Sequence, residues 1–219
     1  MNPSQISVKL KLLSKEEYVS VGKSDPIRFY FWPIIGRMYR KRVELCLAEC
    51  NGGERVLDVG FGSGVNFLNL NEIYKEIHGL DLTAKVDLVA ENFKIYGLHP
   101  KLLNGNILNM PYPDNYFDSV LLVSILEHIK PDEQLTAFRE INRVLKSSGQ
   151  VIYGVPVEQP FMVFSFRLLG VNIREHHFST EEDVSNAAQN VMEKVRLVDM
   201  NNPLPLMKPV YQVGHFVKL

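Results

Sequence analysis

Apolar and polar residues alternate along this chain in two rhythms, and each rhythm predicts one kind of element. Short aliphatic runs bounded by glycine or polar residues are typical of buried strands, and they fall at 55–59, 76–80, 101–103, 117–123 and 150–154. Between them, apolar residues spaced three or four apart predict helices at about 64–74, 83–96 and 131–146. Strands that alternate with helices predict an α/β fold with a doubly wound, mostly parallel sheet.

Upstream of this alternation the chain changes character. Residues 1–25 are mostly polar, an aromatic cluster follows at 29–35, and residues 37–50 have the spacing of an amphipathic helix. We therefore expect an N-terminal arm and helical cap over residues 1–50. The aromatic cluster has three open interpretations: core packing of that helix, a cap that brings Tyr30 to an active site, or shallow docking on a membrane surface aided by the basic residues that follow.

Downstream of the last parallel strand the pattern changes again. Residues 157–178 contain an apolar, aromatic stretch, which we expect to be an insert in a main domain over residues 51–219. Ser179 as a cap, with Glu182 completing a capping box, predicts the start of a further helix. A closing hairpin is predicted from two late strand-like runs, at about 194–200 and 211–219.

Length and composition narrow the class of protein. A chain of 219 residues suits one domain with a full core, and a net charge of −1 argues against a protein that holds nucleic acid through its phosphates. No signal peptide and no apolar run of about 18 residues is evident, so we expect a cytoplasmic protein without an integral membrane span. Cys46 and Cys50, one helical turn apart, are expected to be reduced thiols.

The sharpest chemical signal is a glycine turn directly after the first predicted strand. Residues 56–64 have the sequence Val-Leu-Asp-Val-Gly-Phe-Gly-Ser-Gly, so an aliphatic run ends in an acid and glycines alternate behind it. Glycine allows tight turns with positive φ, and a ligand can approach its backbone because no Cβ stands in the way. The turn therefore predicts a site for a nucleotide-like ligand.

Spacing and charge favour S-adenosylmethionine over a dinucleotide at this turn. The dinucleotide fingerprint is GxGxxG, whereas Gly60, Gly62 and Gly64 have the spacing GxGxG. Asp58, two residues before the first glycine, would oppose a pyrophosphate but suits a ligand with a free ammonium group. Asp81 closes the second strand-like run, about the 20 residues further on at which a ribose-binding acid is expected.

With these features the chain resembles the class I S-adenosylmethionine-dependent methyltransferases, and most closely the broad small-molecule group that includes the ubiquinone and menaquinone C-methyltransferases. Beyond the glycine turn, the resemblance rests on segments in the family's order and spacing, at 105–112, 115–120, 126–129, 140–146 and 149–152. It implies a Rossmann-like, seven-stranded sheet, mostly parallel, with one antiparallel strand near the C-terminus.

The resemblance also implies cofactor-binding positions, which run from the methionyl end of S-adenosylmethionine to its adenine. They are Asp58, Gly60, Phe61, Gly62, Gly64 and Ser124 toward the methionyl end, Asp81 at the ribose hydroxyls, and Leu82, Asn106 and Ile107 at the adenine. All of them lie at or just past the carboxyl ends of predicted strands, where open α/β sheets bind their ligands.

Catalytic residues are less sharply marked. His128 suits a general base because the pKa of histidine lies near neutrality, and His177 is a second candidate that would close the acceptor pocket; structural roles stay open for both. Some relatives bind a divalent metal through a Glu-x-x-Glu-His pattern, but Ser124 replaces the first carboxylate here, so no metal is expected. Glu127 then helps to shape the pocket. Asp118, at the entrance of a strand, is expected to bond backbone amides.

The expected reaction is transfer of a methyl group from S-adenosylmethionine to a small-molecule acceptor, with S-adenosylhomocysteine as the product. An apolar or lipid-like acceptor is preferred, because the N-terminal segment and residues 157–178 are rich in aromatic and aliphatic side chains. Two other classes stay open: a catalytically silent S-adenosylmethionine-binding regulatory module, and a nicotinamide-dependent oxidoreductase, against which the glycine spacing argues.

Overall fold

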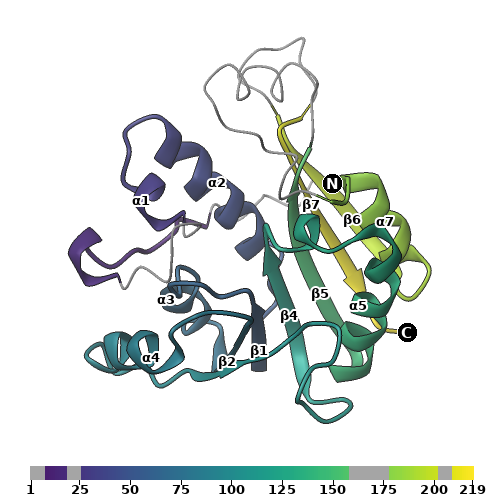
Figure 1. Cartoon of the computed structure of the whole chain (residues 1–219), viewed down its shortest axis with the longest axis horizontal. Helices are drawn as coiled ribbons and strands as arrows, with labels where there is room; N and C mark the ends of the chain where they lie inside the picture. The colour runs from purple at the N-terminus through teal and green to yellow at the C-terminus, as the bar shows by residue number, and fades with distance from the viewer. Residues whose placement is uncertain (1–7, 19–25, 158–177, 202–208) are drawn as a thin grey trace.

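A seven-stranded sheet forms the centre of the molecule (Figure 1). The structure is a computed structural model, and it describes residues 8–18, 26–157, 178–201 and 209–219. The strand order of the sheet is β3-β2-β1-β4-β5-β7-β6. The strands are β1 (Gly53–Val59), β2 (Tyr74–Asp81), β3 (Lys101–Asn104), β4 (Phe117–Val123), β5 (Leu145–Pro156), β6 (Glu193–Met200) and β7 (Tyr211–Val217). Strands β1 to β5 are parallel, and β7 is antiparallel to both of its neighbours. The predicted fold class is therefore confirmed.

The strand order reverses next to β1, and this reversal positions the candidate site. Val59 near the end of β1 pairs with Leu80 of β2 on one side and with Leu122 of β4 on the other. The segments that follow these three strands therefore emerge at the same edge of the sheet. Crevices of this kind, at the carboxyl ends of strands beside a reversal of strand order, are where open α/β sheets bind ligands.

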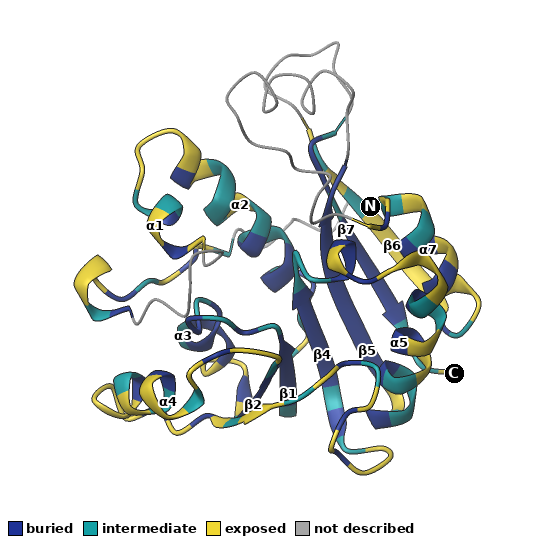
Figure 2. Ribbon diagram, in the orientation of Figure 1, coloured by how far each residue is buried: buried dark blue, intermediate teal, exposed yellow. Residues whose placement is uncertain are grey.

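Helices cover both faces of the sheet, and two neighbouring residues of β1 show how. Val56 packs into one core and Leu57 into the other, because successive strand residues point to opposite faces. The core around Val56 is closed by α2 (Ile35–Leu47), α3 (Phe67–Leu70) and α4 (Val86–Lys94), and the core around Leu57 by α5 (Pro131–Val144) and α7 (Glu181–Gln189). Figure 2 shows the buried central strands between helices whose outer faces are exposed.

The N-terminal segment packs onto the same domain through its aromatic residues. Its short elements are η1 (Lys15–Glu17) and α1 (Ile27–Tyr30). Tyr30 shares a core with α2 and β1 and lies edge-on to Tyr39, with ring centroids 5.5 Å apart. Trp32 and Ile34 stay 47% and 84% exposed. Core packing therefore explains Tyr30, whereas the surface interpretations of the aromatic cluster remain open for its exposed members.

All three helices predicted between the strands are shorter in the structure than in the sequence pattern, and the one expected at 83–96 is α4 (Val86–Lys94). The helix expected at 64–74 is only α3, because Gly64 has a φ of 80°, which a right-handed helix does not allow. The helix expected at 131–146 ends at Val144, and the backbone is already extended at Leu145, with φ −73° and ψ 140°. Lys146 therefore lies in β5 and not in the last turn of a helix.

The predicted cap of the late helix is wrong by one residue. Thr180 is the N-cap of α7: its hydroxyl accepts from Asp183 N at 3.2 Å, and its own amide donates to the Asp183 carboxylate at 2.9 Å. Ser179 lies one residue earlier, where its buried hydroxyl donates to the carbonyl of Ile129 at 2.6 Å. Both registers are compatible with the local sequence, and the burial of Ser179 selects between them.

Two expectations from composition can be compared with the described residues. Cys46 and Cys50 are free thiols, and burial raises the pKa of both, to about 12 for Cys50. Neither thiol is therefore activated as a nucleophile. In the described part of the chain, no helix combines the length and apolar character needed to cross a membrane.

Candidate cofactor and acceptor site

The glycine turn after β1 has the left-handed backbone that its sequence predicts. The φ angles of Gly60, Gly62 and Gly64 are 70°, 52° and 80°, a region that strains residues with a Cβ. A Cβ on Gly60 would stand 2.0 Å from Cδ1 of Ile125, and one on Gly64 would stand 2.6 Å from the ring of Phe93. Around Gly62, no described atom outside its chain neighbours lies within 4 Å of that position. The backbone at Gly62 is thus the part of the turn open to a ligand.

Asp58 lies beneath this turn and is only 1% exposed. Its two carboxylate oxygens accept from Nδ2 of Asn66 at 3.1 and 2.9 Å. Burial raises the pKa of Asp58 to about 7, while the hydrogen bond from Asn66 lowers it and the charge of Asp81 raises it further. The carboxyl group ties the turn to the segment that leads into α3. Direct contact between Asp58 and a cofactor stays a prediction.

Two polar atoms beside Asp58 test whether the turn suits a zwitterionic ligand. Oγ of Ser63 and Oδ1 of Asn66 are buried and have no hydrogen-bond partner within the described ranges. A hydroxyl can donate to a ligand carboxylate, and an amide oxygen can accept from an ammonium group. Together with the buried acid, these atoms fit the methionyl end of S-adenosylmethionine.

Asp81 ends β2 opposite the turn and holds two loops through backbone hydrogen bonds. One carboxylate oxygen accepts from Gly62 N at 3.0 Å, and the other accepts from Thr83 N and Ala84 N at 2.8 Å each. Because it is a partly exposed acceptor beside the open residue of the turn, Asp81 fits the predicted role toward ribose hydroxyls. Leu82 follows and is 71% exposed, so its side chain is accessible to an adenine.

Three further positions predicted to bind the cofactor differ in which atoms they present. Asn106 is exposed, and its side-chain oxygen accepts from Leu108 N at 2.9 Å. Ile107 is 9% exposed and belongs to the core around Leu57. Phe61 is 4% exposed and packs against Phe67, with ring centroids 5.8 Å apart. The side chains of Ile107 and Phe61 are therefore mainly core, and their predicted contact to a cofactor falls to their backbone.

Ser124 directly follows β4 and joins it to β7. Its φ is 58°, an uncommon angle for a residue other than glycine and one that occurs often at functional sites. Its amide donates to Gly154 O at 2.8 Å, and its hydroxyl lies 2.9 Å from the hydroxyl of Tyr211. These bonds hold Ser124 at the carboxyl edge of the sheet, where the resemblance predicts the methionyl pocket.

Glu127 is more deeply buried than its sequence context indicates. It lies in the 3₁₀ turn η2 (Leu126–His128), is 2% exposed, and has no described hydrogen-bond partner at Oε2. Burial raises the pKa of Glu127 to about 8, against the opposing effects of its own amide and of the positive charge of Arg42. Its backbone carbonyl accepts from Phe178 N at 2.8 Å. A buried acid with an unpaired oxygen and a perturbed pKa is a candidate for function.

Arg42, on α2, lies near two tyrosine rings from different elements. Its guanidinium carbon lies 5.0 Å from the ring centroid of Tyr39 and 5.1 Å from that of Tyr211, within the range of cation–π contacts. Its Nε is buried and unpartnered among the described atoms. The available sequence signal was its position four residues before Cys46, which is fully buried, because such residues share one helix face.

Of the two predicted catalytic histidines, the structure describes only one. His128 lies on η2 and is exposed, and His177 lies outside the described residues. A base role for either stays a prediction. The described ranges contain no group of three His, Cys, Asp or Glu side chains arranged to hold a metal ion.

Asp118 has the structural role that its place at the start of β4 predicts. Its carboxylate accepts from Glu54 N at 3.1 Å and from Arg55 N at 2.8 Å, and Lys146 donates to it at 2.7 Å. The side chain thus ties β4 to the beginning of β1 and to β5, at the amino ends of the strands and away from the candidate site.

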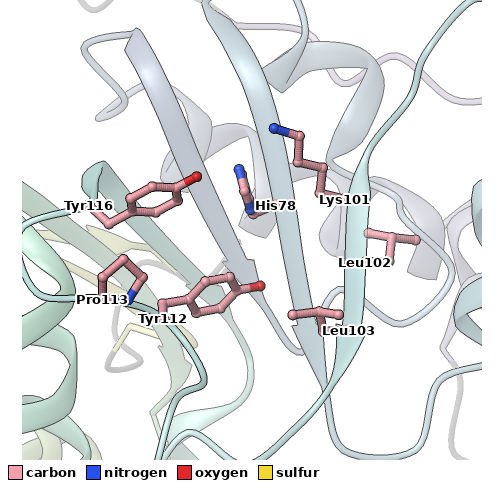
Figure 3. Close-up of a pocket in the computed structure, with 7 residues that line it drawn as sticks. All are labelled: His78, Lys101, Leu102, Leu103, Tyr112, Pro113 and Tyr116. Carbon is pink, nitrogen blue, oxygen red and sulfur yellow. The ribbon is translucent and has the colours of Figure 1, made fainter.

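A separate hollow of about 350 Å³ lies away from the carboxyl ends of the strands (Figure 3). Its lining residues are His78, Lys101, Leu102, Leu103, Tyr112, Pro113 and Tyr116. The chain passes from β3 to β4 without a helix, so this part of the sheet lacks the cover that α5 gives to its centre. The hollow contains none of the residues predicted to bind a cofactor.

Known proteins resemble this chain both in sequence and in fold. Residues 57–153 match the family model described as a methyltransferase domain. Demethylmenaquinone methyltransferase of Geobacillus kaustophilus is 35% identical over 122 residues, which cover 53% of this chain and 50% of that protein. The crystal structure of N-methyltransferase NodS from Bradyrhizobium japonicum, in complex with S-adenosylhomocysteine, aligns with a TM-score of 0.68 at 16% identity, covering 94% of this chain and 96% of that chain. The PH0226 protein from Pyrococcus horikoshii aligns with a TM-score of 0.70 at 18% identity, over 90% and 97% of the two chains.

The solved structures share the fold with this chain, and the sequence matches lie in its central part. In fold and in the sequence of residues 57–153, the chain is similar to the class I S-adenosylmethionine-dependent methyltransferases, as predicted, and the cofactor of that family is S-adenosylmethionine. The chain spans about half the length of the curated relatives it matches, 50% for the Geobacillus kaustophilus protein.

Proposed function

We propose that this protein transfers a methyl group from S-adenosylmethionine to a small-molecule acceptor, preferably an apolar or lipid-like one. The observation that carries the proposal is the convergence of the glycine turn and two acids, Asp58 and Asp81, at the carboxyl ends of β1 and β2. When bound, the cofactor supplies a methyl group that its sulfonium charge has already activated.

The protein's own task in such a reaction is to bind and orient two molecules and to exclude water. Orientation of this kind contributes up to about 7–11 kcal/mol in favourable systems. The open backbone at Gly62 and the carboxylate of Asp81 suit the sugar end of the cofactor, and the buried acid Asp58 suits its ammonium end. No strong acid or base is needed to bind the donor, which agrees with the absence of a sharp catalytic motif in the sequence.

The acceptor preference is supported by side chains at the same edge. Tyr211 of β7 contacts Ser124, which follows β4, and the guanidinium of Arg42 lies near the rings of both Tyr211 and Tyr39. The name of the relative from Geobacillus kaustophilus, demethylmenaquinone methyltransferase, is in line with an apolar acceptor.

Calorimetric titration tests the proposal directly. S-adenosylmethionine, S-adenosylhomocysteine and NAD are titrated into the wild type, Asp81→Asn, and the control Asp87→Asn, an exposed acid on α4. We expect micromolar binding of the first two ligands by the wild type and the control, and at least about 10-fold weaker binding by Asp81→Asn, since a bonded carboxylate contributes about 1.5–3 kcal/mol. Absence of binding by folded wild type, or tighter binding of NAD, refutes the proposal.

Turnover separates an enzyme from a silent binding module. Formation of S-adenosylhomocysteine is measured with a panel of apolar acceptors that differ in the group to be methylated. Release above the rate without acceptor supports a methyltransferase. Tight cofactor binding without release over the whole panel favours the regulatory module instead.

A further inference from the structure

We infer that the hollow beside β3 is a second ligand site, which takes a flat apolar molecule that carries one carboxylate. None of the described residues that line this hollow is among those predicted to bind S-adenosylmethionine. The inference therefore goes beyond the proposed methyltransferase function and does not depend on it.

The first observation is a part of the sheet that no helix covers. The described segment 105–116, between β3 and β4, contains no helix, although parallel sheets are ordinarily covered on both faces. Leu103 of β3 pairs with Leu80 of β2, which is buried, so the two side chains lie on the same face of the sheet. Leu103 is nevertheless 44% exposed. The hollow next to it, of about 350 Å³, has the size of a small-molecule site.

The second observation is a fixed aromatic wall. The rings of Tyr112 and Tyr116 are nearly parallel, with 13° between their planes and centroids 6.5 Å apart. The buried ring of Phe117 lies edge-on to both, at 4.9 and 5.0 Å, and the ring of His78 lies edge-on to both, at 5.8 and 5.5 Å. Two other rings thus contact each tyrosine ring. Fixed parallel rings favour a flat ligand, because little side-chain freedom is lost when it binds.

The third observation is that the hollow has a polar end and an apolar end. Figure 3 shows the hydroxyl of Tyr116, the amine of Lys101 and a ring nitrogen of His78 at one end, whereas Leu103 and Tyr112 lie at the other. A ligand that fills the hollow therefore has an apolar body and a polar group on one side.

Charge at the polar end favours an anion. Nζ of Lys101 donates to Oε2 of Glu76 at 2.8 Å, and Nε of Arg55 and Nε2 of His78 each lie 3.4 Å from the same oxygen. Burial lowers the pKa of His78 against the opposing hydrogen bond with Glu76, so its imidazole is mainly neutral at pH 7. In these described contacts two fixed cations share one carboxylate, which leaves one positive charge in excess. A ligand carboxylate balances this charge, and a cationic ligand group is repelled.

The test compares an anionic probe with its neutral analogue. Binding of 2-naphthoate and of 2-naphthamide is measured by fluorescence titration at pH 7 and low ionic strength, with and without saturating S-adenosylhomocysteine. The side chain of Lys101 is 59% exposed, which limits the contribution of its charge to about 1 kcal/mol or less. We expect the wild type to bind 2-naphthoate about 3- to 5-fold more tightly than 2-naphthamide, and equally so in the presence of S-adenosylhomocysteine.

Two pairs of variants locate the bound probe. Lys101→Met should abolish the preference for 2-naphthoate, whereas Lys75→Met, which removes a lysine paired with Glu54 instead, should keep it. Leu103→Glu should weaken binding of 2-naphthoate at least about 10-fold, because it removes an apolar contact and adds a second carboxylate to the wall. Its control is Leu88→Glu on α4, a leucine that is 51% exposed, which should keep the affinity of the wild type. If Leu103→Glu does not fold, Leu103→Ala replaces it, with an expected loss of at least about 3-fold.

Equal binding of the two probes by the wild type overturns the inference, as does an unchanged preference in folded Lys101→Met. Displacement of 2-naphthoate by S-adenosylhomocysteine also overturns it, since the probe then occupies the cofactor site. A dimer that Leu103→Glu dissociates in sedimentation would assign the hollow to a second copy of this chain, with the same consequence. Failure of S-adenosylhomocysteine to bind refutes the methyltransferase proposal separately, because the probe preference is also measured without it.

Discussion

Two buried glutamates near α2 differ in whether the fold gives them partners. Glu49, just after the end of α2, is 5% exposed, and its carboxylate accepts from Arg196 of β6 at 2.7 and 2.6 Å and lies 3.2 Å from Nδ1 of His215 of β7. Burial raises the pKa of Glu49, but the hydrogen bonds of His215 and Arg196 outweigh it and leave the pKa lowered. Glu127 is 2% exposed, has one unpaired oxygen, and has a raised pKa.

The difference separates a structural acid from an acid available to a ligand. Around Glu49 the chain provides a bidentate guanidinium, which is the geometry that offsets the desolvation of a buried carboxylate. Other buried polar atoms, among them Oε1 of Gln134 and the hydroxyl of Tyr153, also lack a described partner, so the contrast holds between the two glutamates and not for the core as a whole. Glu49 joins the end of α2 to the antiparallel strands through its carboxylate, whereas Glu127 makes its described contact to another segment through its backbone carbonyl, which accepts from Phe178 N.

The largest expected effect is on the pH dependence of stability, to which the two glutamates contribute with opposite sign. Glu127 has a pKa of about 8 against an ordinary value of 4.5, so the folded state keeps a proton that the unfolded chain loses. Stability should fall as the pH rises from about 5 to 8, by up to about 1.4 kcal/mol per pH unit for this group. Asp58, with a pKa of about 7, adds a loss in the same direction. Urea denaturation at several pH values should show a flatter decline in Glu127→Gln, and parallel curves would contradict this account.

The second largest effect is expected from breaking the paired acid. Glu49→Gln should lower the free energy of unfolding at pH 7 by about 2–3 kcal/mol, less than the roughly 3–5 kcal/mol of fully buried pairs, because the side chain of Arg196 is 45% exposed. The lowered pKa of Glu49 means that its contribution is present above pH 4.5 and is lost as the pH falls. The control is Glu54→Gln, whose exposed pair with Lys75 should contribute less than about 1 kcal/mol. Equal urea midpoints for the two variants would remove the distinction.

The smallest expected effect concerns two tyrosine hydroxyl groups, one with a hydrogen-bond partner and one without. Tyr211→Phe removes a hydroxyl bonded to Ser124 and should cost about 1 kcal/mol. Tyr112→Phe removes a buried hydroxyl that has no partner among the described residues and should be neutral or slightly stabilising. Thermal unfolding of both variants measures this difference. A larger loss in Tyr112→Phe would show that its hydroxyl has a partner after all.

The sequence by itself determined the turn after β1 and the acid at the end of β2, because the patterns that predict them lie in adjacent residues. The spacing of Gly60, Gly62 and Gly64 predicted a left-handed turn, and each φ is positive in the structure. The apolar run before that turn fixed β1, and Asp81 closed β2 as expected. Helix boundaries were less certain: the cap at Thr180 and the early end of α5 depend on burial and on backbone geometry, which a propensity pattern does not contain.

Only the tertiary structure decided the acceptor side. Arg42 and Glu127 lie far apart in the sequence, and each resembles an ordinary residue in its own segment: one of several basic residues on a helix, and half of a Glu-His pair. Tertiary packing buries Glu127 and the Nε atom of the half-buried Arg42, and it leaves an unbonded atom on each. A turn is encoded by the conformational preferences of adjacent residues, whereas an unpaired buried polar group exists only once distant segments have excluded water around it.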